Sequence, residues 1–406
     1  MDSQTGQALG PIEMPSVQTR LGEAEEQALL RVVRQGKSYA VGAQSGPEGE
    51  AFEQAFVEMM GCADAVSVNT CSSALELSAI LAGLGPGDEV ILPAHTFVAS
   101  AVPFAKTGAT VLWADIEPDT REISAASVAS LVTDRTRAVV VVHLYGLSAD
   151  MDAIMAVADE HNLIVVEDCA QAPGARYKGR RVGTIGDFGC FSFHSHKNIT
   201  TLGEGGMLAV RDVEHGLQAR RMRWMGNWPF EHDRDRDWVP AGNNVVQPLS
   251  NRWPGNYCLP EALAAVGTEL LKRLDLINEQ RRAQAARFIG AMKDYPELSF
   301  QHVPDGCEHV YHLMSARYNG EAHGRSRDEL LTLVRSKYKL KCIVQYWPLH
   351  HTDLFDKFGF GEADVPETDR FYSNMISFPW WSDMGDNVLD DMATRTRQAL
   401  DELRCG

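Results

Sequence analysis

The stretch FSFHSHKNITTLGEGGMLAV, residues 191–210, contains two short apolar runs with a lysine and a glycine cluster between them. The runs have the length of buried strands, and the glycines indicate a turn that connects them. A lysine at the end of a buried strand loses hydration, which favours its neutral amine, the form that reacts with carbonyl compounds. Lys197 is therefore either a surface charge in a turn or a nucleophile in a recess.

Short apolar runs recur from residue 66 to residue 210, and several of them are separated by segments with helical spacing. Strands that alternate with helices are typical of an α/β fold with a mostly parallel sheet covered on both faces. Such sheets carry their sites at the carboxyl ends of the strands. The runs cover residues 66–68, 89–92, 111–115, 138–144, 163–167, 190–193 and 207–210.

The second half of the chain has a different pattern. Residues 227–256 are rich in Pro, Asn, Asp and Trp and predict an irregular surface loop or a lid over a neighbouring subunit. We expect a large domain over residues 1–270, including an N-terminal arm, and a smaller C-terminal α+β domain over residues 271–406. The expected elements are a long helix over 261–284, strands near 309–318 and 342–346, and a closing amphipathic helix over 387–404.

Composition excludes several classes of protein. The 406 residues contain 38 Lys and Arg against 55 Asp and Glu, a formal charge of −17, which argues against non-specific binding of nucleic acid. The start lacks the apolar segment of a signal peptide, and no apolar run reaches the ~18 residues of a membrane span. The eight cysteines are scattered without a CxxC pair, so reduced thiols and no zinc site are expected. We expect a soluble cytoplasmic protein with no membrane or nucleic-acid partner.

Two further segments place candidate site residues at predicted strand ends. Asp168, in LIVVEDCAQAPGA (163–175), is a carboxylate that needs a cation or several donors there, although a structural cap is an equal alternative. Ser72 and Ser73, in NTCSSALEL (69–77), open a helix whose free amides can bind an anion, although they could simply cap it. A lysine, a carboxylate and a phosphate cradle together fit pyridoxal phosphate.

The motifs resemble those of the DegT/StrS-like sugar aminotransferases, which are fold-type-I pyridoxal phosphate enzymes. FSFHSHKNITTLGEGGM is similar to the lysine motif of that family, and the resemblance covers nearly the whole chain. It implies a large domain with a mostly parallel seven-stranded sheet. The other matching stretches, in order, are GPGDEVILPAHTFVASA (85–101), VVHLYGLSADMDAI (141–154), VEDCAQAPGA (166–175), GNYCLPEALAAVG (255–267) and HVYHL (309–313).

The resemblance implies roles at the reacting end of the cofactor. Lys197 would form the internal aldimine with pyridoxal phosphate and then move the proton between the substrate carbon and the cofactor. Asp168 would pair with the pyridinium nitrogen. Gln171 would hydrogen-bond the side of the ring that carries the 3′ oxygen, and Phe97 would stack on the ring face.

The resemblance also implies how the phosphate is held. Ser192 and Ser72 would donate to it, together with backbone amides near Cys71. Asn256 would reach the phosphate of the other subunit's cofactor, so the resemblance implies a homodimer with shared active sites.

This sequence departs from the family pattern at four positions. Cys71 stands before Ser72 where the family usually has Gly-Thr, so the part played by Cys71 in the cradle is open. Pro173 replaces a histidine. Leu202 is an extra residue between the lysine and GEGG, and Cys258 stands where an arginine is common.

Several histidines have competing interpretations. His194 and His196 alternate on one strand face and could suggest a metal, but no third ligand follows at a motif spacing. His194 is instead a candidate for the substrate pocket. The pair at 350 and 351 is expected to lie in an ordinary loop, and the tryptophans at 347, 380 and 381 are expected in a core or interface.

These observations predict an aminotransferase with ping-pong kinetics that moves an amino group to a keto-sugar or a related cyclic ketone. The family implies glutamate or glutamine as the donor, and a nucleotide-linked ketosugar, a sugar phosphate or an aminocyclitol precursor as the acceptor. One alternative is a pyridoxal phosphate-type sugar dehydratase of the same fold, in which a histidine occupies the lysine position. Another is a regulatory protein that kept the fold without turnover.

Overall fold

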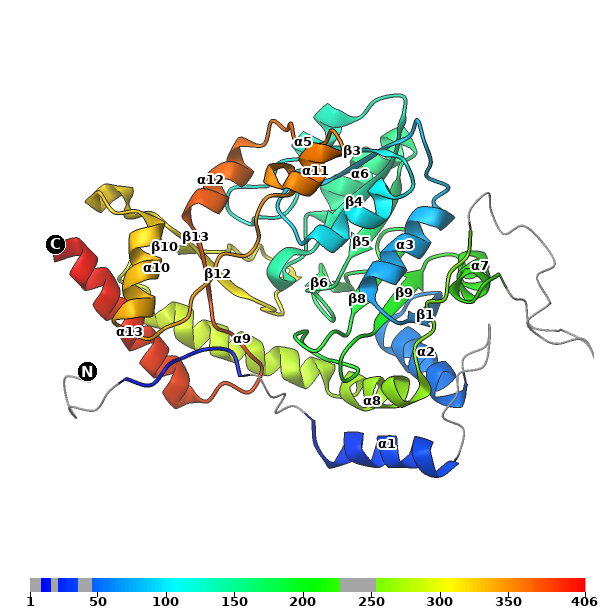
Figure 1. The fold of residues 1–406 in the computed structure, drawn as a ribbon, viewed down its shortest axis with the longest axis horizontal. Helices are drawn as coiled ribbons and strands as arrows, with labels where there is room; N and C mark the ends of the chain where they lie inside the picture. Colours follow the sequence, from blue (N-terminus) through cyan, green and yellow to red (C-terminus); the bar gives the residue numbers. More distant parts are fainter. Residues whose placement is uncertain (1–8, 16–20, 36–45, 227–252, 406) are drawn as a thin grey trace, which may run out of the picture.

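The computed structural model describes residues 9–15, 21–35, 46–226 and 253–405. A large mixed α/β unit carries the central sheet, and a second group of helices and short strands follows it in the chain (Figure 1). None of the described helices is both long enough and apolar enough to cross a membrane. The predicted loop or lid over 227–256 lies outside the described residues up to position 252.

The central sheet contains seven strands, and each of the seven predicted runs forms one of them. β9 is the one strand of this sheet that runs antiparallel to its neighbours, β1 and β8, and the other adjacent pairs are parallel. The predicted mostly parallel α/β sheet is therefore confirmed. The order is β1 (Asp64–Val68), β9 (Gly206–Val210), β8 (Phe188–Ser192), β5 (Ile164–Asp168), β4 (Thr136–Val142), β2 (Glu89–Pro93) and β3 (Thr110–Ala114).

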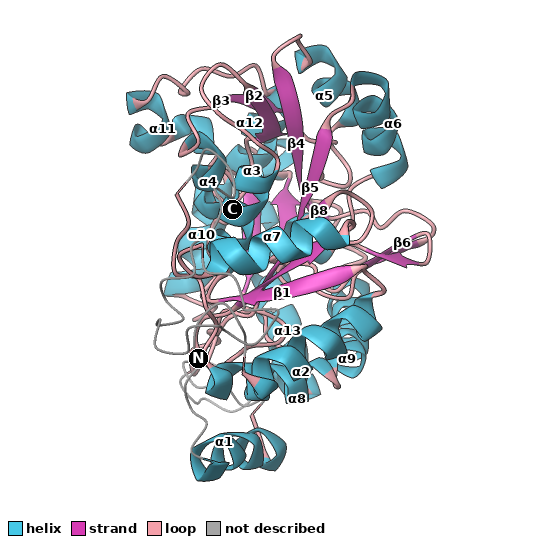
Figure 2. Cartoon of the chain, turned by 90° about the vertical axis from the view of Figure 1, so that its right-hand side faces the viewer, coloured by secondary structure: helices cyan, strands magenta, loops and turns pink. Residues whose placement is uncertain are grey.

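Both faces of this sheet are covered by helices, which explains the continuous apolar runs (Figures 1 and 2). Successive side chains of a strand enter different cores: Val139 and Val141 lie in one, Val140 in the other. The first core includes residues of α2 (Pro47–Met60), α5 (Ala125–Leu131), α6 (Met151–His161) and α8 (Glu261–Leu271). The second includes residues of α3 (Cys71–Leu81), α4 (Val102–Ala105), α7 (Val213–Arg223) and α11 (Asp353–Lys357), while α1 (Glu23–Gln35) packs on α8.

The single long helix predicted over 261–284 is wrong, because the chain forms two helices there. α8 ends at Leu271 and α9 (Leu274–Ala291) follows after a corner at Arg273, whose φ of −106° and ψ of 3° are not helical. The guanidinium of Arg273 donates to Glu25 Oε1 at 2.5 Å and holds this corner. The change of direction carries α9 from the first core to a third core, which contains Phe288.

The C-terminal part has its own core around a three-stranded antiparallel sheet. Its strands are β10 (Leu298–Phe300), β12 (Met314–Tyr318) and β13 (Met375–Phe378), and its helices are α10 (Arg327–Ser336), α12 (Pro366–Asn374) and α13 (Asp386–Cys405). Of the strand predicted near 309–318 only residues 314–318 form one, while the closing helix is confirmed. A small sheet of β6 (Arg176–Tyr177), β7 (Arg180–Arg181) and β11 (Cys307–Glu308) joins both halves of the chain. Ile12 pairs with Leu340, so the arm reaches the C-terminal core, and the domain boundary near 270 stays a prediction.

The strand predicted over 342–346 is wrong. Ile343 alone pairs with β13, through Ser377, and the next amide toward the site, that of Gln345, donates to the Met375 sulfur at 3.2 Å. The carbonyl of Gln345 instead accepts a hydrogen bond from the Tyr145 hydroxyl at 2.5 Å. The chain leaves the sheet edge because this contact draws it toward the large sheet.

Candidate active site

A cavity of about 600 Å³ lies where β2, β5 and β8 end and α3 begins. The position is the one expected for a parallel sheet, because loops that leave the carboxyl ends of strands surround it. The wall also includes residues of the C-terminal half and one residue of the N-terminal arm. Predicted site residues that line it are Cys71, Ser72, Phe97, Asp168, Gln171, Ser192, His194 and Lys197.

Asp168 is the last residue of β5 and is 3% exposed. The hydroxyl of Ser100 donates to its Oδ2 at 2.7 Å, and the amide of Ala170 donates to its Oδ1 at 3.0 Å. Thr96 Oγ1 lies 2.8 Å from Ser100 Oγ and supports it in turn. The contact with Ala170 is the structural cap that the sequence analysis gave as an alternative role for Asp168. The carboxylate makes this contact and lines the cavity as well.

Lys197 follows β8 in a loop that folds back on itself. The amide of Phe193 donates to the Gly205 carbonyl at 2.8 Å, the amide of Thr201 donates to the Phe193 carbonyl at 3.0 Å, and the Lys197 amide donates to the His194 carbonyl at 2.9 Å. Asn198, fully buried, anchors the loop by donating to the Val310 carbonyl at 3.1 Å. The lysine is therefore held by backbone contacts on both sides.

Burial lowers the pKa of Lys197 below its ordinary value, although the carboxylate charges of Asp168 and Glu204 oppose this shift. A lowered pKa increases the fraction of neutral amine at neutral pH, and this fraction is the nucleophile. The opposing effect of Asp168 places its carboxylate close enough to Lys197 to act on it. The two residues that the sequence singled out thus share one electrostatic environment.

The N-terminus of α3 forms the third part of the cavity. Thr70 is the cap: its side chain accepts from the Ser73 amide at 3.0 Å. The first amides of a helix have no intrahelical partner, and those of Cys71 and Ser72 open this one toward the cavity. A Cβ on Gly206 would lie 2.5 Å from the Thr70 carbonyl carbon, so the glycine allows β9 to approach the cradle closely.

Gln171 and Tyr346 line the cavity, and Tyr145, together with His95, supports them from outside it. Gln171 Oε1 accepts from the Tyr145 amide at 2.8 Å, which leaves the NH₂ end of Gln171 for the cavity. The Tyr145 hydroxyl lies 2.7 Å from His95 Nε2 and donates to the Gln345 carbonyl. Since the tyrosine proton is used there, His95 Nε2 is the donor, and burial lowers the pKa of His95 to about 3. Tyr346 stacks on Tyr145 with ring centroids 6.5 Å apart.

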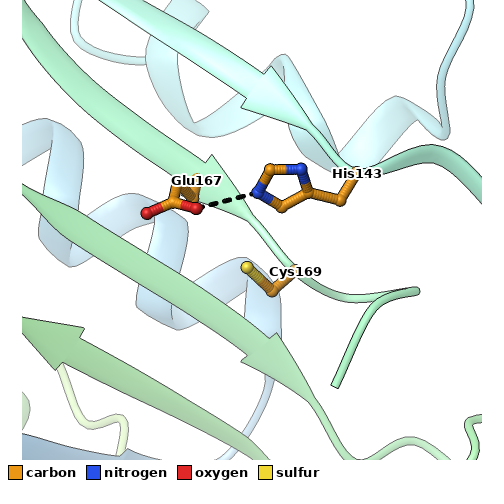
Figure 3. A group of neighbouring side chains, drawn as sticks. All are labelled: His143, Glu167 and Cys169. Carbon is orange, nitrogen blue, oxygen red and sulfur yellow. Dashed lines mark hydrogen bonds and ion pairs between the residues drawn. The ribbon is translucent and has the colours of Figure 1, made fainter. Parts of the chain in front are cut away.

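Glu167 fixes the connection from β5 to β8 and also contacts His143, as Figure 3 shows. Its Oε2 accepts from His143 Nε2 at 2.9 Å and from the Gly183 amide at 2.7 Å, and its Oε1 accepts from the amides of Ile185 and Gly186, each at 2.7 Å. His143 Nδ1 accepts from the Ala149 amide at 3.2 Å, which makes His143 a neutral donor to Glu167. The neighbouring Cys169 thiol is close, but both ring nitrogens of this histidine are already used.

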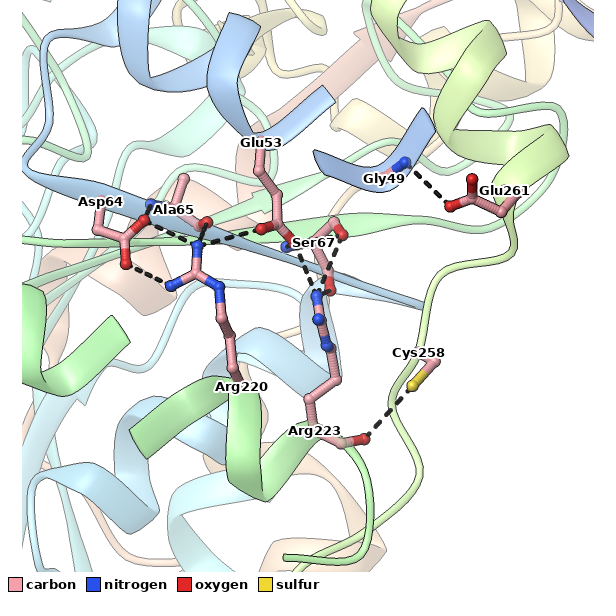
Figure 4. A network of polar contacts seen from close by, with 9 residues as sticks. All are labelled: Gly49, Glu53, Asp64, Ala65, Ser67, Arg220, Arg223, Cys258 and Glu261. Carbon is pink, nitrogen blue, oxygen red and sulfur yellow. Dashed lines mark hydrogen bonds and ion pairs between the residues drawn. The ribbon is translucent and has the colours of Figure 1, made fainter. Parts of the chain in front are cut away.

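A second buried network joins α7 to β1 (Figure 4). Arg223 is 2% exposed and donates to Glu53 Oε1 at 2.7 Å, and the amide and hydroxyl of Ser67 donate to the same oxygen. The backbone of Arg223 also carries the 255–258 segment, because its carbonyl accepts from the Tyr257 amide at 2.8 Å. Cys258 Sγ lies 3.9 Å from that carbonyl. Asn256 is exposed and does not line the cavity, so its action on another subunit stays a prediction.

The remaining departures from the family pattern are accommodated locally. Leu202, the extra residue, has a φ of 73° and is 38% exposed, so the loop is partly open to solvent at this position. Burial raises the pKa of Cys71 well above its ordinary value, and its thiol stays protonated. The carbonyl of Pro173 accepts from Asn278 Nδ2 at 2.9 Å. Trp380 lies in the C-terminal core and lines the cavity as well, while Trp347 is 61% exposed.

Sequence reasoning missed several residues of the cavity wall. Ser100 lies three residues after Phe97 in a stretch that the resemblance already included, and its contact with Asp168 follows no periodicity. Tyr346 and Lys341 come from irregular backbone, and Met14 comes from the N-terminal arm, for which no motif was available. These residues are brought to the cavity by tertiary packing alone.

The donors of this cavity fit pyridoxal phosphate. The cofactor needs an amine for its aldehyde, a carboxylate for its ring nitrogen and amide donors for its phosphate. Lys197, Asp168 and the start of α3 supply these groups around a single cavity. The close approach of Gly206 to the Thr70–Cys71 peptide also keeps the cradle free of side-chain atoms from β9.

Comparison with known proteins agrees with the geometry. The sequence model of the DegT/DnrJ/EryC1/StrS aminotransferase family matches residues 20–397. The spore coat polysaccharide biosynthesis protein SpsC of Bacillus subtilis is 36% identical over 356 residues, which cover 87% of this chain and 90% of that protein. A UDP-N-acetyl-3-dehydro-alpha-D-glucosamine 3-aminotransferase of Acidithiobacillus ferrooxidans is 31% identical over 356 residues, 87% of this chain and 89% of that protein.

Solved structures show the same fold. The X-ray structure of DesV from S. venezuelae, in complex with a ketimine intermediate, superposes with a TM-score of 0.80 at 31% identity and covers 93% of this chain and 94% of that one. This family depends on pyridoxal phosphate, and its relatives named above include sugar aminotransferases. The chain is an aminotransferase of fold type I and belongs to the DegT/DnrJ/EryC1/StrS aminotransferase family.

Proposed function

We propose that this protein uses pyridoxal phosphate to transfer an amino group from an amino acid, glutamate or glutamine, to a keto-sugar. The observation that carries the proposal is the single cavity in which Lys197, with its lowered pKa, faces the carboxylate of Asp168. When bound, the cofactor supplies an aldehyde that captures amines and a ring that accepts electrons. The described residues of the chain supply the remaining functions.

Lys197 would hold the cofactor through its amine and, once an incoming amine has displaced it, would carry a proton to and from the substrate carbon. Asp168, held by Ser100 and Ala170, keeps a negative charge at the ring nitrogen and so favours its protonated form. Ser192, Ser72 and the first amides of α3 orient the phosphate. Gln171 presents its NH₂ group to the ring oxygen, because Tyr145 fixes the other end of the amide.

A keto-sugar is favoured as acceptor because one relative, at 31% identity, is named as an aminotransferase of a UDP-linked 3-dehydro sugar. The cavity volume of about 600 Å³ suits a ligand of cofactor-plus-sugar size. His194 lies in the cavity wall, with its Nε2 3.7 Å from Glu204 Oε1, and contacts the acceptor in this proposal. A homodimer is part of it as well: Asn256 of one subunit completes the phosphate site of the other.

The rival sugar dehydratase is disfavoured, since those enzymes resemble this chain with a histidine in place of Lys197. A regulatory homologue without turnover is disfavoured by the retention of Lys197, Asp168, Gln171 and Ser192 around one cavity. The two rivals predict different products: a dehydratase eliminates water, and a regulator consumes no amino donor.

The experiment follows the cofactor by absorbance in the reconstituted protein while L-glutamate or L-glutamine is added, and then a keto-sugar. Borohydride reduction and mass spectrometry of peptides should locate the cofactor on Lys197. Lys197→Ala should lose the covalent link and turnover, whereas Lys293→Ala, an exposed lysine of the C-terminal half, should retain both. Native turnover by Lys197→Ala would refute the proposal.

Asp168→Asn tests the ring partner separately. The amide can still fill the space and accept from Ala170, so the cofactor should remain attached to Lys197. Turnover should fall by orders of magnitude because a neutral ring is a poor electron acceptor. A native rate would assign Asp168 to structure alone.

A further inference from the structure

His350, His351 and Asp369 form a cluster outside the cavity. The histidines end a short 3₁₀ helix, Leu349–His351, and Asp369 lies in α12. His351 Nε2 is 2.8 Å from Asp369 Oδ1, and His350 Nε2 is 3.3 Å from the same oxygen. One potential ligand atom from each of the three residues lies within 4.8 Å of the others.

His350 is the unusual member of this cluster. It is 5% exposed, and within the described part of the chain neither of its ring nitrogens has a hydrogen-bond partner. Its 3.3 Å approach to Asp369 lacks the alignment of a hydrogen bond. An unpaired buried imidazole loses free energy of hydration without replacement. His143, a fully buried histidine that also lies next to a carboxylate, has partners at both nitrogens.

The other carboxylate whose charge acts on His350 is that of Asp115, and its oxygens are used elsewhere. Asp115 Oδ2 accepts from the Glu367 amide at 2.9 Å, and Oδ1 accepts from the amides of Thr368 and Ile116, each at 2.8 Å.

We propose that His350, His351 and Asp369 bind a divalent transition-metal ion of the Zn²⁺ type. Two imidazoles and one carboxylate suit zinc, whereas Mg²⁺ and Ca²⁺ prefer oxygen ligands alone. Bonds of about 2.0–2.1 Å in a tetrahedron place ligand atoms about 3.3 Å apart, so the observed 2.8 and 3.3 Å separations need only small adjustments. The side chains of His351 and Asp369 are each 44% exposed, which leaves room for water as a further ligand.

The position of this metal site gives it a structural part. The Leu349 amide donates to the Ala94 carbonyl at 2.8 Å, next to β2. In α12, Phe371 packs edge-on against His95, with ring centroids 5.2 Å apart. A metal ion joins the 349–351 helix to α12. It thereby stabilises the segment that follows Tyr346, a residue of the cavity wall.

The test is calorimetric titration of Zn²⁺ into the full-length protein after removal of metals with chelator. Wild type should bind one equivalent, and His351→Ala and Asp369→Asn should each bind it more than ten-fold more weakly. Both changes affect partly exposed side chains, so the variants should fold as wild type does by circular dichroism. His323→Ala, an exposed histidine of another 3₁₀ helix, is the matched control and should bind as wild type does.

X-ray absorption of the zinc-loaded wild type provides a second, independent measurement, and it should find two imidazoles with oxygen ligands. Absence of zinc binding by wild type would overturn the proposal, and so would a sulfur ligand. The proposal would also be overturned if both variants bound zinc as wild type does while His196→Ala bound none. The ion would then lie in the cavity.

Discussion

Replacing Glu167 by Gln tests whether the support beneath the site depends on a charge or only on shape. Each carboxylate oxygen of Glu167 accepts two hydrogen bonds: Oε2 from His143 and Gly183, Oε1 from Ile185 and Gly186. Gln has nearly the same size, but its NH₂ group faces two donors in either orientation of the amide. His143 cannot change its tautomer to help, because its Nδ1 accepts from Ala149.

Two buried donors without acceptors cost about 1–3 kcal/mol each, so Glu167→Gln should lower the free energy of unfolding by about 2–6 kcal/mol. With an m-value near ~3 kcal/mol/M, the urea midpoint falls by roughly 0.7–2 M at an unchanged slope. Tryptophan fluorescence measures this transition. Glu160→Gln, at an exposed position of α6, is the control and should stay within about 0.5 kcal/mol of wild type. An unchanged midpoint for Glu167→Gln would refute the reasoning.

The pH dependence of the same comparison gives a sharper check. Burial acts to raise the pKa of Glu167, but its hydrogen bonds with His143, Gly183 and Gly186 outweigh burial and hold the pKa below the ordinary value of 4.5. A lowered pKa contributes stability that is fully present above pH 4.5 and is lost as pH falls through the folded-state pKa. The difference between wild type and Glu167→Gln should therefore be constant from pH 5 upward and shrink in stronger acid. A difference that grows on acidification would contradict the charged form.

Two further changes address the cavity. In Gly206→Ala the new Cβ would lie 2.5 Å from the Thr70 carbonyl and 2.7 Å from the Cys71 amide nitrogen, so the start of α3 must move. Absorbance titration should then show that pyridoxal phosphate binds at least ten-fold more weakly. An affinity equal to that of wild type would show that the phosphate cradle lies elsewhere. Tyr145→Phe removes the hydroxyl that bridges His95 and the Gln345 carbonyl. Because both groups are left without a hydrogen-bond partner, the free energy of unfolding should fall by about 2–6 kcal/mol. Its KM for the keto acceptor should rise more than its kcat falls, and equal effects on both would argue against a role of Tyr145 in positioning the cavity wall.

The sequence was most informative for strands that are buried on both faces of the large sheet. Residues of β4 such as Val139 and Val140 enter opposite cores, so apolar residues follow one another without interruption and predict a strand of a covered parallel sheet. The run at 342–346 is also mostly apolar, but the strand predicted there is wrong. The carbonyl of Gln345 accepts a hydrogen bond from the Tyr145 hydroxyl and not from a neighbouring strand. The corner at Arg273 was also invisible, since helical spacing continues across it.

The site could be predicted to the extent that its residues end strands. Asp168 and Ser192 are the last residues of β5 and β8, and topology brings such positions together whatever the loops do. Ser100 was missed although it touches Asp168, because a serine in an irregular stretch carries no signal of its own. The loop predicted at His350 gives no sign of Asp369, because that carboxylate, 3.3 Å from the His350 ring, lies 19 residues further along the chain on another element.

The two sides of the cavity are built in physically different ways, and this bears on how the acceptor is chosen. The Lys197 side rests on strands and on the buried contacts of Glu167 and Asn198, so small changes of sequence there move reacting groups that must stay within tenths of an ångström. The opposite side is irregular backbone around Tyr346, fixed mainly by the Tyr145 hydroxyl and by packing. Irregular segments accept substitution and insertion with less loss of stability. Differences in acceptor between this protein and its relatives should therefore follow the residues around 341–346 and not those around Lys197.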